Sequence, residues 1–201
     1  MRCHPDAHTQ MVEIVPYHAH WPDEFQQVAL GLRQVLGSIA LRIDHIGSTA
    51  VPGLAAKDII DVQVTVPALE PETAYTSALQ AAGFVLRSGV TRDHRPPGDS
   101  EPDSAWAKRL FGAAPDQRLT NVHVRALGHP NQRYALLFRD YLRAHPQAVA
   151  AYAEVKRRLA SAFPDQLRVY TEVKDPVCDV ILAAAEEWAA ATGWQPGRPD
   201  A

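Results

Sequence analysis

The segment Leu41–Val66 reads LRIDHIGSTAVPGLAAKDIIDVQVTV and says more about the fold than any other part of the sequence. Apolar residues dominate both of its ends and predict two strands joined by a turn and a loop. In the turn, Gly47 and Ser48 can offer backbone N–H groups and a hydroxyl to a phosphate, and the second strand aims Asp61 at the same spot. We therefore expect the layout of a nucleotidyl-transferring site.

The pattern of Gly-Ser, a spacer and an acid within an apolar strand resembles the signature of the nucleotidyltransferase superfamily. One position departs from it, because Gln63 stands where that signature has a second acid. Two carboxylates on alternate strand positions would face the same way and hold Mg²⁺ together, whereas Gln63 offers one neutral amide oxygen. A two-metal mechanism then has too few anionic ligands unless Asp44, Asp58 or an acid from a later loop moves in.

Composition excludes several function classes. The chain has 201 residues, of which 46% are hydrophobic and 21% charged, and its formal net charge is -3. This balance is typical of one globular domain and argues against generic nucleic-acid binding or attachment to a membrane surface. No apolar run approaches the roughly 20 residues that span a bilayer, and the polar start has no signal-peptide core. We therefore expect a cytoplasmic protein without a membrane partner.

The remaining patterns predict an α/β (α+β) fold, with a mixed β-sheet, flanking helices and a C-terminal three-helix segment. Residues 1–11 are expected to be a disordered N-terminal tail and 193–201 a flexible C-terminal tail. Between them we expect a single domain, 12–192, with a mixed α/β half at 12–128 and a helical half at 129–192. The expected helices are 21–37, 71–82, 134–144, 147–163 and 167–192, the further strands are 84–86, 106–111 and 119–126, and 92–104 is expected to be a mobile loop.

Several longer motifs make the resemblance more specific. They are HIGSTAVPGLAAK (45–57), IDV (60–62), NVHV (121–124), FRDYLR (138–143), YAEVK (152–156) and YTEVK (170–174). Together they resemble the GrpB family, also called UPF0157, over residues 12 to 190. The resemblance implies a nucleotidyltransferase-like fold and, in some bacteria, fusion of a similar domain to dephospho-coenzyme A kinase.

Asp61 and His123 are the candidate catalytic residues, since the family's matching strand carries His where the superfamily has a third acid. With His45 they could form a divalent metal site for Zn²⁺ or Mn²⁺, which imidazole suits better than Mg²⁺. His123 could instead act as a general base on an attacking hydroxyl. In a third reading, it only hydrogen-bonds Asp61 across the sheet.

Phosphate binding is predicted at the Gly47 turn, with Ser48 and Thr49 as hydroxyl donors and Lys57 as counter-charge. The alternative is that these hydroxyls cap the turn and that Lys57 is solvated. Lys156 lies on or beside the apolar stripe of its helix, so it must either pair with Glu154 or Asp140 or meet an anion in the cleft between the two halves. Lys174 poses the same choice.

Two hypotheses of different classes follow. The first is an enzyme that binds a nucleotide or another phosphate-bearing small molecule and transfers a nucleotidyl group, weakly or to an unusual acceptor. The second is a non-catalytic binding or chaperone-like module that uses the same cleft, or that docks a protein partner through its helical half. Gln63 favours the second, because losing a metal-binding acid costs a catalyst more than a binder.

Overall fold

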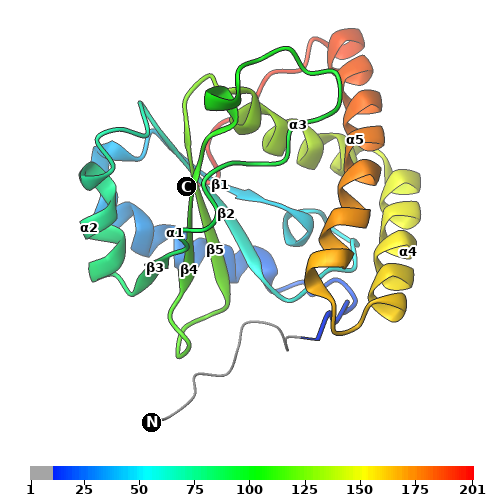
Figure 1. Cartoon of the computed structure of the whole chain (residues 1–201), viewed down its shortest axis with the longest axis horizontal. Coiled ribbons are helices and arrows are strands. Elements are labelled where there is room, and N and C mark those ends of the chain that lie inside the picture. The colour runs from blue at the N-terminus through cyan, green and yellow to red at the C-terminus, as the bar shows by residue number, and fades with distance from the viewer. Residues whose placement is uncertain (1–10) are drawn as a thin grey trace.

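The computed structural model describes residues 11–201, and a five-stranded sheet runs through its middle (Figure 1). The strands are β1 (Arg42–Ile46), β2 (Ile60–Val66), β3 (Phe84–Leu86), β4 (Arg109–Ala113) and β5 (Thr120–Ala126). Their order across the sheet is β1-β2-β5-β4-β3. The central pair β2–β5 is parallel and the other neighbours are antiparallel, so the sheet is mixed.

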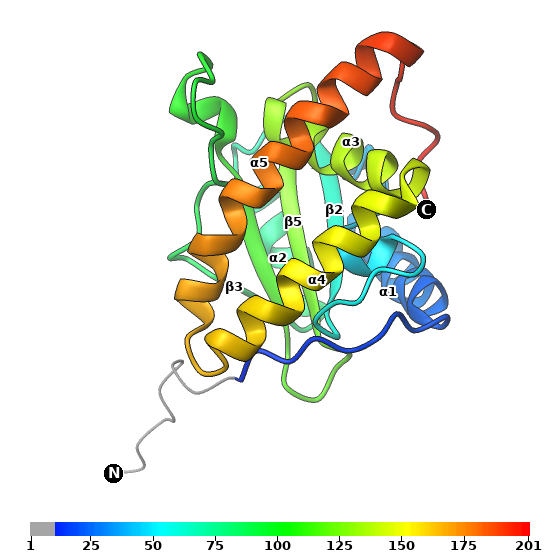
Figure 2. The ribbon, with the colours of Figure 1, turned by 90° about the vertical axis from the view of Figure 1, so that its right-hand side faces the viewer.

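Helices cover both faces of this sheet (Figures 1 and 2). One face carries α1 (Trp21–Leu36) and α2 (Thr73–Ala81), and the other carries α3 (Pro130–Ala144), α4 (Pro146–Ala162) and α5 (Leu167–Thr192). The α/β fold with flanking helices and a C-terminal three-helix segment is therefore confirmed. None of the helices in the described part of the chain has the length and hydropathy required to span a bilayer.

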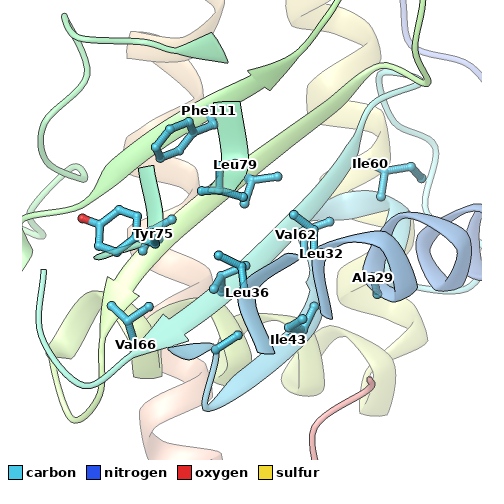
Figure 3. Close-up of a cluster of buried hydrophobic side chains, with 14 of the residues drawn as sticks. Ala29, Leu32, Leu36, Ile43, Ile60, Val62, Val66, Tyr75, Leu79 and Phe111 are labelled. Carbon is cyan, nitrogen blue, oxygen red and sulfur yellow. The ribbon is translucent and has the colours of Figure 1, made fainter. Parts of the chain in front are cut away.

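The main hydrophobic core lies between the sheet and the α1–α2 layer (Figure 3). Leu32 and Leu36 of α1 and Leu79 of α2 pack there against Val62 and Phe111 of the sheet. Apolar residues at helical spacing on α1 meet apolar residues at every second position of the strands, which is why these sequences fold as they do. Side chains of this core are almost fully shielded from solvent.

The opposite face of the two central strands is polar. The parallel register places Asp61 beside Asn121, Gln63 beside His123 and Thr65 beside Arg125. Side chains on a strand alternate between faces, so these six residues point away from the core and toward α3–α5. A polar surface on paired central strands is unusual for a parallel pair and marks this side of the sheet as the place for chemistry.

The C-terminal segment differs from the flexible tail expected at 193–201. The Asp200 carboxylate accepts hydrogen bonds from the His45 amide at 2.9 Å and from Arg139 Nη1 at 2.7 Å. The Ala201 amide donates to the Ile43 carbonyl at 3.1 Å, so this segment continues along β1. Asp200 anchors this segment because its carboxylate is a counter-charge for the buried Arg139. Local sequence patterns do not reveal this pairing. Of the expected N-terminal tail, 1–11, residues 1–10 lie outside the described residues. Its last residue, Met11, is exposed.

Candidate functional site

A cavity of about 350 Å³ lies between the polar face of the sheet and the three C-terminal helices. The sheet side supplies Asp61 and His123, and the helix side supplies aromatic and basic side chains. All the residues predicted to bind phosphate also line it, namely Gly47, Ser48, Thr49, Lys57, Lys156 and Lys174. The fold therefore brings the two halves of the chain together around one cavity.

The Gly47 turn lies directly against the carboxylate of Asp61. Gly47 has φ 69°, a conformation that favours glycine, and an added Cβ would lie 2.5 Å from Asp61 Oδ2. The other carboxylate oxygen, Oδ1, accepts a hydrogen bond from Asn121 Nδ2 at 3.0 Å. The turn and the acid thus share one corner of the cavity, as the sequence predicted.

Replacing Gly47 with Ala should cost about 2–3 kcal/mol of stability, because the Cβ adds a clash with Asp61 to the backbone strain of a positive φ. Gly53→Ala is the matched control, since Gly53 has φ 79° but no atom within 4 Å of its added Cβ. Urea unfolding of both variants separates the cost of backbone strain from the cost of the clash with Asp61. Equal losses in the two would contradict the close approach of Gly47 to Asp61.

His123 is arranged as a hydrogen-bond donor to Asp61. Its Nε2 lies 3.5 Å from Asp61 Oδ1, while its Nδ1 lies 3.4 Å from both Lys108 Nζ and Arg125 Nη2. A protonated lysine and an arginine can only donate, so Nδ1 must accept and the ring proton belongs on Nε2. Burial lowers the pKa of His123 to about 4, so the ring is neutral near pH 7. In this tautomer Nε2 has no lone pair for a metal or for a substrate proton.

The carboxylate of Asp61 stays ionised beside this ring. Burial alone would raise its pKa, but hydrogen bonds from His123 and Asn121 and the charge of Lys57 bring the pKa below its ordinary value. Asp61 is therefore an anion on the cavity wall, with one oxygen close to the Gly47 turn.

His45 does not join the site, which corrects its assignment as a metal ligand. It stands opposite Val62 in the β1–β2 register, on the core face of the sheet. Its ring stacks on Phe25 of α1 with centroids 4.6 Å apart, and Nε2 lies 3.0 Å from Thr49 Oγ1. Burial lowers the pKa of His45 to about 4, so it is a neutral core residue that supports the turn.

Gln63 occupies the place of the second acid and is bonded to a cation. Its Oε1 accepts a hydrogen bond from Arg125 Nη1 at 2.7 Å, and its Nε2 donates to the Gln132 carbonyl of α3 at 3.2 Å. Arg125 in turn donates from Nε to Asp93 Oδ2 at 2.8 Å. A catalytic pair of carboxylates would hold a metal ion at this place. Here the Arg125 guanidinium is bonded to Gln63 instead.

Asp93 is a site residue that the sequence patterns did not predict. It belongs to the loop expected to be mobile, yet its carboxylate accepts hydrogen bonds from Lys108 Nζ at 2.6 Å, from Arg125 and from Asn131 Nδ2 at 3.0 Å. Burial opposes ionisation, but Arg125 and Lys108 hold the pKa of Asp93 far below its usual range. Arg125 alternating with apolar residues on a central strand was the signal, because such a buried cation requires an acid partner.

The other acids considered for a metal site lie elsewhere. Asp44 pairs with Arg42 at 2.9 Å, and Asp58 accepts from Trp21 Nε1 at 2.7 Å and from Arg118. Neither lines the cavity. The loop acid that does enter the site, Asp93, is already held by its own basic partners.

The two hydroxyls of the turn have different roles. Thr49 is buried, and its Oγ1 donates to the Ile59 carbonyl at 3.3 Å and contacts His45, so it holds the turn together as in the capping alternative. Ser48 Oγ accepts a hydrogen bond from Lys156 Nζ at 2.9 Å across the cavity. Of the two hydroxyls, only that of Ser48 bridges the turn to the helical half.

Lys156 is a buried cation without a carboxylate partner. Its side chain is 2% exposed, and no Asp or Glu of residues 11–201 lies within ion-pair distance of its Nζ. Its neighbours are Ser48 Oγ and the Tyr152 ring, whose centroid is 4.8 Å away. Burial and the nearby Lys174 lower its pKa to about 7. The partners considered for it are engaged elsewhere, Glu154 with Arg157 and Arg158, and Asp140 with Arg139.

The other two cavity lysines differ from each other. Burial lowers the pKa of Lys57, whose Nζ lies 5.8 Å from the centroid of the Tyr170 ring. Lys174 Nζ donates to Asp175 at 3.0 Å and lies 3.5 Å from Cys178 Sγ. Burial opposes the charge of Lys174, but Cys178 and Asp175 raise its pKa overall. Lys174 is therefore the paired lysine, and Lys57 and Lys156 are the ones available to an anion.

The fold and this cavity define an α/β protein with a basic pocket between its sheet and its C-terminal helices. The chain belongs to the GrpB family, since the family described as "GrpB protein" matches residues 11–184.

Its relatives include proteins of different length. A protein of Mycolicibacterium paratuberculosis called "Dephospho-CoA kinase" is 39% identical over 197 residues, which cover 92% of this chain and 48% of that protein. This chain thus spans about half the length of that relative. "UPF0157 protein BH1888" of Halalkalibacterium halodurans is 35% identical, covering 89% of this chain and 84% of the relative.

A solved structure has the same fold. The structure titled "Crystal structure of conserved protein GrpB from Enterococcus faecalis" superimposes with a TM-score of 0.72 at 30% sequence identity. The match covers 88% of this chain and 99% of that one.

Proposed function

We propose that this protein binds a nucleotide or a coenzyme A precursor through its phosphate, in the cavity beside the Gly47–Ser48 turn, and that it does so without a metal. The observation that carries the proposal is Lys156, a buried ammonium that lacks a carboxylate partner within the described chain. Buried charges are ordinarily paired, because taking an unpaired charge out of water costs several kcal/mol. A ligand phosphate held by Lys156, Lys57 and the Ser48 hydroxyl supplies the missing counter-ion.

The residues that line the cavity, and Gln63 behind them, do not fit the divalent metals considered from the sequence. Gln63 is bound to Arg125, and the proton on His123 Nε2 faces Asp61. Within residues 11–201, no three His, Cys, Asp or Glu side chains are placed to hold a metal ion together. The single carboxylate of Asp61 cannot hold the two metal ions that in-line nucleotidyl transfer normally uses. We therefore propose a binding protein and no nucleotidyl transfer.

The name of the mycobacterial relative narrows the choice of ligands. This chain matches about half of a protein called "Dephospho-CoA kinase", so a coenzyme A precursor belongs among the candidates. The chain itself has no Gly-x-x-x-x-Gly-Lys-Ser/Thr loop, the motif that cradles phosphates in many kinases. We propose only a related ligand for this chain and no kinase reaction.

Isothermal titration with ATP, CTP, coenzyme A and dephospho-coenzyme A, in EDTA and in Mg²⁺ or Mn²⁺, tests the proposal. We expect at least one of them to bind in EDTA, and Lys156→Met to weaken that binding by about 10- to 100-fold, the usual loss for a charge-assisted contact. Arg158→Met, an exposed cation on the same helix, should leave affinity unchanged. Binding that requires a divalent ion, or no binding of any ligand, would overturn the proposal.

Gln63→Asp separates binding from transfer. An aspartate there would face Arg125, whose guanidinium would neutralise it, so we expect no gain of Mn²⁺ affinity and no radiolabel transfer from nucleoside triphosphates. A variant that acquires Mn²⁺ binding and transfers nucleotide would instead support the enzyme hypothesis.

A further inference from the structure

We infer that the pocket binds its phosphate ligand together with a proton, and that the amine of Lys156 is the group that takes the proton up. This inference rests on the proposed function and specifies how the same site is regulated. It follows from where Lys156 is placed, between a turn that offers hydroxyl and amide groups and two helices that offer no free carboxylate. Phosphate binding in this pocket would then respond to pH in the physiological range.

The surroundings of Lys156 disfavour its charge as long as the pocket is free of anions. The ammonium reaches the turn through Ser48 Oγ and lies over the Tyr152 ring. The groups that act on it come from three sides: Lys57 from the loop before β2, Tyr152 and Arg157 from α4, and Lys174 and Cys178 from α5. Asp175, the acid of α5 that lines the cavity, is already paired with Lys174. Burial lowers the pKa of this amine most, Lys174, Lys57 and Arg157 lower it further, and Cys178 opposes them, so the pKa lies close to 7.

An arriving phosphate reverses this balance. A dianion beside the amine favours the ammonium form and raises the pKa of Lys156, since an opposite charge within roughly 4–6 Å stabilises the protonated state. The proton comes from solvent, no bond other than N–H forms, and the complex gains one positive charge. Below about pH 6 the free protein already carries this proton, so the affinity for a dianion that does not itself titrate is independent of pH there. As pH rises above 7, affinity falls by up to about tenfold per unit until the pKa of the complex is reached.

Sulfate is the probe for the first test, because it is a dianion of similar shape that does not titrate between about pH 5 and 10. Titration calorimetry in buffers of different ionisation enthalpy counts the protons taken up. We expect about half a proton per sulfate near pH 7 and close to one near pH 8, with affinity falling in parallel. Lys156→Arg keeps its charge throughout, so it should bind sulfate with a flat pH profile. Lys156→Met should bind weakly and also without pH dependence. The measurements are made in a Lys57→Arg background as well, because the pKa of Lys57 is lowered by burial too.

The second test needs no ligand. The ¹⁵Nζ and ¹³Cε signals of Lys156, assigned by comparison with Lys156→Arg, should titrate near pH 7 in the free protein. Titration near pH 10 would overturn the inference whether or not sulfate binds. Sulfate binding that stays constant from about pH 6 to 9 would overturn it too, while leaving the proposed function in place. In a third outcome, Lys156 titrates near pH 7 but no sulfate binds at pH 6. This would count against the proposed function, because the pocket would then carry the Lys156 cation without binding an anion.

Discussion

Replacing Lys156 with Met should raise the free energy of unfolding at pH 6 by about 1–4 kcal/mol, the gain seen when well-packed apolar residues replace buried ion pairs or triads. Met keeps the unbranched shape of the side chain and removes an ammonium that is 2% exposed and has no carboxylate partner. The same change should weaken phosphate binding by about 10- to 100-fold. Stability and binding would then move in opposite directions, which is typical of a functional residue held in an unfavourable environment.

The gain in stability from Lys156→Met should become smaller as pH rises. The pKa of Lys156 is about 7 in the folded protein and 10.5 as an ordinary lysine, so between these values the unfolded chain binds more protons. Stability of the wild type therefore increases from about pH 7 upward, while the Met variant lacks this increase. Urea unfolding at pH 6 and pH 9 measures the difference. Arg158→Met on the exposed side of α4 should change stability by less than about 0.5 kcal/mol at either pH. A Met variant less stable than the wild type at pH 6 would contradict the burial of an unpaired charge.

Replacing Asp93 with Ala should have the opposite effect and cost about 3–5 kcal/mol, because it leaves Arg125 and Lys108 as buried cations without an acid. The pKa of Asp93 lies far below its ordinary value, so its contribution is complete above about pH 4 and declines as pH falls toward the pKa of the folded state. Unfolding measured at pH 7 and pH 3 should show a smaller gap between wild type and variant at the lower pH.

Asp103→Ala is the control for this prediction. Asp103 lies in the same loop and pairs with Arg92, but its side chain is 66% exposed. We expect a loss below about 1 kcal/mol, as for other surface ion pairs. Equal losses for Asp93 and Asp103 would mean that the buried network around Arg125 contributes little and that the loop is as mobile as its composition suggested.

The strands and helices could be predicted because local patterns determine them. Val62 and Val122 alternate with polar residues, and this alternation placed β2 and β5 and put Asp61 and His123 on strands. The three C-terminal helices could be predicted as well. Apolar stripes indicated α3, α4 and α5, and prolines between them marked where one helix ends and the next begins. The position of Lys156 on a buried stripe was sufficient to predict a choice between pairing and ligand binding.

What local patterns could not give was the partner of each buried charge. Asp93 lies in a stretch rich in Pro, Gly and Asp, and nothing nearby indicates that it meets Arg125, 32 residues away along the chain. Asp200 likewise reaches Arg139 from a segment that looked like a tail. His45 is a different case, because its own strand was sufficient to place it: it shares a strand face with Ile43, a core residue, and therefore points away from Asp61.

The decisive experiment is a crystal structure of the protein with dephospho-coenzyme A or pyrophosphate, grown in EDTA. We expect phosphate oxygens within hydrogen-bond distance of Lys156 Nζ and Lys57 Nζ, next to Ser48, with Gln63 still bonded to Arg125. A phosphate bound outside this cavity, or one that enters it only when a metal ion joins Asp61 to His123, would show that metal-free phosphate binding by these lysines is wrong.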